Sequence, residues 1–186
     1  MNINSSQLRI LPLVVAIVFL FAGSIFAQTR DHLTDPESEL IRFHQELDKR
    51  IEVLIKAADR RFALINGTTL PATKKLIKDE PDWGDLPTGT RAQLLGDVAG
   101  ILDEAITNIE DVSRRDPKNP LISRALRKLT AAANGYLVQL QSLRGKSTDA
   151  DEISAIDRAA DNAGQIVQAG SKVPAPAPEN DKKKKP

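Results

Sequence analysis

Apolar residues beyond about residue 34 recur at steps of three and four, the spacing that gives a helix one apolar face. No segment shows the two-residue alternation of a half-buried strand. The pattern predicts four helices, at about 35–65, 91–115, 120–144 and 149–169. With short connections between most of them, the sequence predicts an all-α protein, an up-down-up-down four-helix bundle over residues 28–170.

Polar residues mark the expected helix starts. Thr34 with Glu37 fits a capping box, and so does Thr90 with Gln93. Asn119 is placed to cap the third helix. Within the first segment, leucines at seven-residue intervals continue past residue 44 and predict one helix of about thirty residues, roughly 45 Å long; they are Leu40, Leu47 and Leu54.

The second and third helices carry the most regular apolar series. In the second, the seam consists of Leu95, Val98, Leu102, Ala105, Ile109 and Val112. In the third it consists of Ile122, Leu126, Leu129, Ala133, Tyr136, Leu140 and Leu143. Leu102 and Leu129 occupy central seam positions and are predicted to lie in the core. Gly96 and Gly100 in the second helix predict close packing of soluble helices.

The amino terminus has the order of a secretory signal peptide. Arg9 precedes an uncharged apolar run, and small residues follow it up to Ala27. This order predicts a signal peptide at residues 1–27 with cleavage after Ala27, and Ser24 as the alternative cleavage position. Because residues 10–27 hold no charge, an uncleaved membrane anchor is the other interpretation. Export predicts a periplasmic or secreted protein.

Two segments fall outside the expected bundle. The connection at 67–89 is longer than a compact bundle needs, and part of it, 69–80, has the pattern of a short helix. Trp83 in this connection is predicted to fold back onto the core, with a role as a partner anchor as the alternative. Residues 171–186 are rich in proline, alanine and lysine and are predicted to be a disordered tail.

Composition excludes several classes of site. The chain has no cysteine, which excludes disulfides, thiolate metal sites and thiol nucleophiles. Its only methionine is Met1, and its two histidines lack the Glu-x-x-His spacing of di-iron bundles. No catalytic, cofactor-binding or metal-binding residue is therefore predicted. Without Arg9 the chain has 25 basic and 25 acidic residues, and this balance argues against nucleic-acid binding.

Two charged side chains fall near the expected seam. His44 is expected to be a partly exposed histidine at one end of the bundle. Arg61 is expected to extend its charged group to the surface, where Asp97 meets it, because a buried arginine without a partner is costly.

These features favour an exported, non-enzymatic helical bundle that acts through protein or envelope-surface contacts. The candidate contact residues are Trp83, Lys182, Lys183, Lys184 and Lys185. The partner class is an unknown protein or an anionic envelope surface, with no membrane span once the signal is removed. One alternative is a lipid- or envelope-surface-binding protein whose amphipathic helices open on contact. Another is an enzyme that works with carboxylates.

The signal peptide leads to the first testable prediction. Protein recovered from its host should begin at Gln28, or at Ile25 if the alternative site is used, because the apolar segment is removed on export. Amino-terminal sequencing or intact mass measures this directly. Recovery of only the full-length chain, and only in detergent, would show an uncleaved anchor.

Overall fold

The computed structural model describes residues 30–69 and 80–174, and every regular element in these ranges is helical. The helices are α2 (Asp35–Phe43), α3 (Leu47–Asn66), α4 (Arg91–Arg115), α5 (Pro120–Arg144) and α6 (Ala150–Gly170). The predicted all-α class is confirmed for this part of the chain. The expected signal peptide, nearly all of the short helix at 69–80 and the lysines at 182–185 lie outside the described residues.

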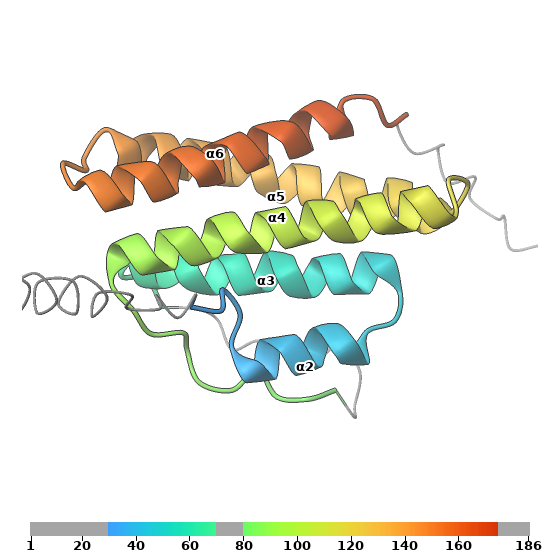
Figure 1. The fold of residues 1–186 in the computed structure, drawn as a ribbon, viewed down its shortest axis with the longest axis horizontal. Coiled ribbons are helices and arrows are strands. Elements are labelled where there is room, and N and C mark those ends of the chain that lie inside the picture. The colour runs from blue at the N-terminus through green and yellow to red at the C-terminus, as the bar shows by residue number, and fades with distance from the viewer. Residues whose placement is uncertain (1–29, 70–79, 175–186) are drawn as a thin grey trace, which may run out of the picture. The chain divides into compact units, whose positions relative to one another are not determined.

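The four long helices lie lengthwise beside one another (Figure 1). We call α3 to α6 the helical body. In it α4 and α5 each pack against both α3 and α6, whereas α4 and α5 touch each other only lightly. The short helix α2 packs against α3 and no other described helix. One side of α3 is therefore covered by α2, and the opposite side faces the rest of the body.

The core is aliphatic and rich in alanine. Leu102 and Leu129, the predicted central seam residues, are each only 1% exposed. Tyr136 and Phe62 stack with ring centroids 4.9 Å apart, and the Tyr136 hydroxyl donates to the Asp59 carboxylate at 2.7 Å. Alanines fill the places where helices approach closely; the fully buried ones are Ala57, Ala58, Ala105, Ala125, Ala133, Ala159 and Ala163. The predicted interior of the second and third helices is confirmed at these seam positions.

The local helix-start signals work as predicted. Thr34 and Glu37 form a reciprocal capping box at α2, and Thr90 and Gln93 form one at α4. The Asn119 side chain accepts from the backbone N–H of Leu121 at the start of α5. These caps satisfy amide groups that have no partner within their own helix.

The predicted single helix at 35–65 is wrong, because the chain breaks between Phe43 and Leu47 and forms α2 and α3 instead. Neither glycine nor proline causes this break. His44 ends α2 in an extended conformation, and its imidazole is buried against the Glu80 carboxylate at 2.8 Å. Folding α2 back onto α3 buries Leu40 completely. Tertiary contacts, rather than local propensity, decide the break.

The core supplies the second prediction. Replacing Leu102 or Leu129 with Ala should lower the free energy of unfolding by roughly 2–5 kcal/mol, because each truncation leaves a cavity among packed helices. The matched control is Leu86→Ala, since Leu86 is 48% exposed and should tolerate the same truncation. Urea unfolding followed by circular dichroism measures all three. Equal midpoints for core and control variants would contradict the described core.

Candidate functional site

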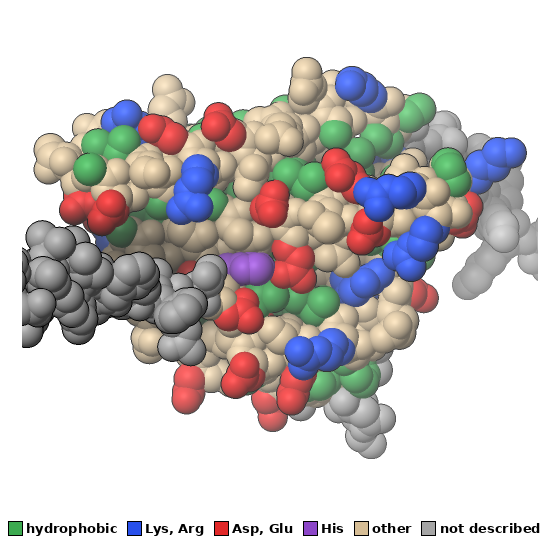
Figure 2. All heavy atoms as spheres, viewed as in Figure 1, with side chains coloured by type: hydrophobic (Ala, Val, Ile, Leu, Met, Phe, Trp, Pro, Cys, Tyr) green, Lys and Arg blue, Asp and Glu red, His purple; other side chains and the backbone are tan. Residues whose placement is uncertain are grey.

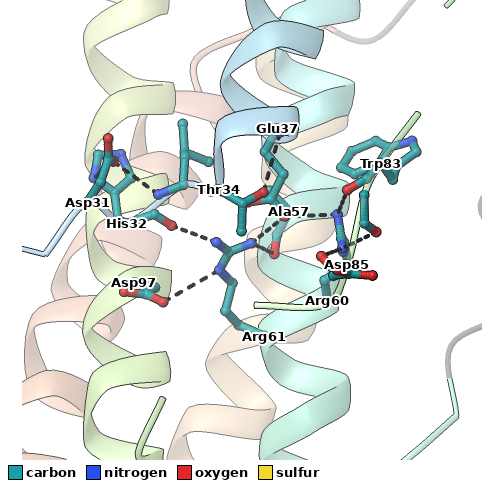
Figure 3. Close-up of polar contacts among 12 residues, drawn as sticks. Asp31, His32, Thr34, Glu37, Ala57, Arg60, Arg61, Trp83, Asp85 and Asp97 are labelled. Atoms are coloured by element: carbon teal, nitrogen blue, oxygen red, sulfur yellow. Dashed lines mark hydrogen bonds and ion pairs between the residues drawn. The ribbon is translucent and has the colours of Figure 1, made fainter. Parts of the chain in front are cut away.

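Buried charges gather where α2 and the two segments 31–34 and 80–89 meet α3 (Figure 3). We call Glu37, Arg60, Arg61 and Asp97 the ionic cluster. All four side chains are at least 95% buried. Two guanidinium groups and two carboxylates balance in formal charge, as a buried group of this size requires.

Arg61 is the centre of the cluster. Its guanidinium donates to Glu37 Oε1 at 2.5 Å and to the carbonyls of Ala57 and His32 at 3.0 and 2.8 Å. Its Nε lies 3.8 Å from Asp97 Oδ2. The expected contact with Asp97 is present, but the expected surface position is wrong, because Arg61 is fully buried and Glu37 supplies a second carboxylate. One side chain of α3 thus joins α2, α4 and the segment before α2.

Arg60 holds the segment that carries Trp83. Its guanidinium donates to the carbonyls of Trp83, Gly84 and Asp85 at 2.7, 3.2 and 2.5 Å, and lies 3.2 Å from Glu37 Oε1. It also lies over the Trp83 ring, 5.4 Å from the ring centroid. Burial lowers the pKa of Arg60, and the neighbouring Glu37 carboxylate opposes this shift. Trp83 is 8% exposed and packs with the core, as the core-capping prediction requires.

Two glycines permit the close approach of these segments. A Cβ on Gly84 would lie 2.6 Å from the Pro36 ring, and Gly84 has a positive φ of 60°. A Cβ on Gly100 would lie within 2.9 Å of the His32 side chain. Gly100 therefore admits a histidine from the segment before α2, which corrects the prediction that another helix packs there. The Nε2–H of that histidine donates to the Glu104 carboxylate at 2.8 Å, and this hydrogen bond raises the pKa of His32.

The contacts of the ionic cluster hold α2 and the segment at 80–89 against α3. Each guanidinium is engaged by carboxylates and backbone carbonyls, so these contacts leave little of either group to approach a substrate. His44, expected to be partly exposed, is only 4% exposed and is paired with Glu80. Among the described residues no group of three or more His, Asp or Glu side chains is placed to hold a metal ion.

A second charged region lies at the opposite end of the helical body, around the α4–α5 turn. We call Arg114, Arg115, Lys118, Arg124, Arg127 and Lys172 the basic end. The last turn of α4 and the first two turns of α5 supply most of them, and Lys172 lies two residues after the end of α6. Figure 2 shows most of the Lys and Arg side chains of the visible face at this end. Sequence reasoning missed this region, although one signal for it was present: residues 117–148 contain six basic residues and no acidic one.

Acidic residues of α3 engage part of the basic surface of α5. Lys128 bridges Asp48, at 3.1 Å, and Glu52, while Arg124 lies 3.6 Å from Asp48. Burial acts to raise the pKa of Asp48, but Lys128 outweighs it and the pKa falls below its usual value. Lys118, Arg127 and Lys172 have no charged partner in the described ranges. Lys118 and Lys172 are exposed and are therefore readily available to an outside group, while Arg127 is half-buried.

Two surface grooves accompany these charges. One, of about 230 Å³, is lined mainly by aliphatic side chains of α4, α5 and α6, beside Lys172. The other, of about 380 Å³, lies between α4 and α6 and has a polar lining that includes Asp103, Arg158 and Asn162. Of the helices described, none is long and apolar enough to cross a membrane.

No family model, curated protein or solved structure gives a significant match to the chain.

The ionic cluster generates the third prediction. Glu37→Gln should lower the free energy of unfolding by about 3–5 kcal/mol, because it leaves two buried guanidinium groups without their shared carboxylate. Glu39→Gln is the matched control, since Glu39 lies on the exposed side of the same helix. Hydrogen exchange should show the largest loss of protection in α2. Identical exchange in α2 for both variants would show that the cluster does not fasten this helix.

Proposed function

We propose that the chain is an exported, non-enzymatic protein that binds an anionic envelope surface through its basic end. In this proposal α3 to α6 act as an up-down-up-down four-helix bundle, and α2 is a clamp on one side of it. Export rests on the order of basic, apolar and small residues that ends at Ala27.

The observation that carries the proposal is the charge distribution between the helices. α5 holds four basic residues and no acidic one, whereas α6 holds four acidic residues and one basic one. The basic end contains six cations. Its acidic neighbours are Glu110, Asp111 and Asp116 along the chain, together with Asp48 of α3, which lies 3.6 Å from Arg124. A positive end on a body that is otherwise acidic orients the protein toward an anionic surface.

The lysines at 182–185 support the same proposal. They follow Lys172 along the chain and add four positive charges after a spacer rich in proline and alanine. Each lysine or arginine near an anionic lipid surface contributes about 1 kcal/mol, screened over roughly 8 Å at physiological salt. Binding by the basic end and these lysines together is therefore expected to be reversible and sensitive to salt.

Contact with another protein is the second candidate, and the outer face of α5 favours it. Val138 is 69% exposed, the most exposed large apolar side chain described. The nearby exposed positions carry small or uncharged residues: Ala131, Asn134, Gly135, Gln141 and Ser142. A charge-free face of this kind suits a helix of a partner better than it suits an anionic surface.

The fourth prediction tests surface binding with vesicles of equal parts phosphatidylglycerol and phosphatidylcholine. The double variant Lys118→Gln, Arg127→Gln should partition about 30-fold more weakly than the unchanged protein, because two contributions of about 1 kcal/mol are lost. Co-sedimentation at low and high salt measures the effect. Neutral phosphatidylcholine vesicles should bind neither protein.

The matched control is Arg91→Gln, Lys146→Gln, which removes the same charge at the other end of the helical body. It should change partitioning less than about twofold if the basic end is the contact surface. Equal losses of partitioning in both double variants would show that net charge, and not its position at the basic end, determines vesicle binding. No binding by the unchanged protein would refute the surface proposal and leave the α5 face as the candidate.

A further inference from the structure

The aliphatic groove lies between α4, α5 and α6, close to the basic end. Its floor is formed by Ile106, Ile109, Leu126, Leu129 and Ile166. Ala169 lies on its exposed border, and Gln165, Gln168, Glu110 and Lys172 supply the polar groups around it. The lining contains no aromatic ring, so flat ring systems find no stacking partner there.

Tight packing on one side makes the groove a fixed feature of the helical body. A Cβ on Gly170 would lie 2.0 Å from Thr130 Oγ1, so the last turn of α6 contacts α5 directly. The Thr130 hydroxyl donates to the Leu126 carbonyl at 2.7 Å, which fixes this side chain. Leu129 and Ile166 are each 1% exposed and belong to the core itself. The floor of the groove therefore exists before any ligand arrives.

The dimensions of the groove suit one narrow apolar chain. Its volume of about 230 Å³ is below the roughly 300–1,000 Å³ of pockets for drug-sized ligands. From Gln165 to Lys172 it follows the end of α6 and the two residues after it, for roughly 10 Å at 1.5 Å per residue. A fully extended chain advances about 1.2 Å per bond, so roughly eight carbons match this length.

The groove is amphipathic at its Lys172 end. Lys172 is exposed and has no ion-pair partner among the described residues, while Gln168 beside it offers an amide donor. Glu110 is the only acidic residue of the lining and lies on α4, on the other side from the α6 residues. A ligand whose charged group contacts Lys172 must therefore be an anion. The floor of the groove next to Lys172 is aliphatic, so the other end of that ligand must be aliphatic as well.

We propose that this groove binds a free medium-chain fatty acid, with the alkyl chain on the floor between α4, α5 and α6 and the carboxylate at Lys172. The proposal goes beyond surface binding by the basic end and does not depend on it. A single acid molecule uses the groove alone, whereas an anionic surface would also meet Lys118 and Arg127, which have no charged partner among the described residues.

The fifth prediction is tested with the protein purified from its host and with hexanoate, octanoate, decanoate and dodecanoate below their micelle concentrations. Affinity measured by calorimetry should rise about fourfold per added methylene, which corresponds to about 0.8 kcal/mol, until the chain fills the groove. Beyond about eight to ten carbons the gain should level off. Amide resonances of Ile109, Leu126 and Ala169 should shift on binding.

Variants that fill the groove give the decisive comparison. Ala169→Trp should weaken decanoate binding at least tenfold, because the indole occupies the space of the alkyl chain. Ala131→Trp is the matched control, since Ala131 is an exposed helical alanine that does not line the groove. Gln165→Trp repeats the test from the other end of the groove if Ala169→Trp does not fold. Equal affinities for these variants and the control would overturn the proposal.

Lys172→Gln tests the position of the carboxylate. It should weaken decanoate binding about fivefold and leave decanol binding unchanged, because decanol carries no charge. Unchanged decanoate affinity would overturn the assignment of Lys172. Absence of binding by any of the acids at millimolar concentration would overturn the groove proposal, and the vesicle experiment with the basic-end variants would still decide surface binding separately.

Discussion

The buried guanidinium of Arg61 is the interaction on which the arrangement of α2 depends. An arginine in the interior is stable only where carboxylates and carbonyls replace the water it has lost. Glu37 of α2, Asp97 of α4 and the His32 carbonyl provide that replacement. The requirement acts in both directions, since Glu37 is fully buried and needs the two arginines of α3. α2 is consequently held to α3 by charge pairing as well as by Leu40.

This constraint extends to the long connection before α4. Arg60 shares Glu37 with Arg61 and uses its remaining donors on three successive carbonyls from Trp83 to Asp85. Those carbonyls belong to a segment without regular structure, so they have no helical partners of their own. The same guanidinium also lies over one face of the Trp83 ring. Arginine, tryptophan and the loop backbone thus form one packed unit on α3.

Sequence patterns predicted the features of this structure that depend on neighbouring residues. The capping boxes at Thr34 and Thr90 depend on residues three apart, and the seam positions of Leu102 and Leu129 depend on helical periodicity. The break near His44 was missed because its cause, Glu80, lies 36 residues further along the chain. The heptad from Leu40 to Leu47 continues across this break, so periodicity gave no warning. Of the two carboxylates that contact Arg61, Asp97 was predicted and Glu37 was not.

Charges are buried at one end of the helical body and mostly exposed at the other, and this difference is the physical basis for the proposed role of the basic end. The charges of Arg60 and Arg61 are buried and paired, and they hold α2 and the segment at 80–89 in place. Substitutions of these arginines are therefore expected to change the fold. Lys118 and Lys172 are exposed and Arg127 is half-buried, and none of the three has a charged partner within the described chain. Lys172 lies beside a groove whose floor is already part of the core. A cation kept in water has lost little hydration energy and can approach an anion at low cost. An outside anion can therefore bind at the basic end. The charged groups of the ionic cluster already contact one another and the backbone of the protein.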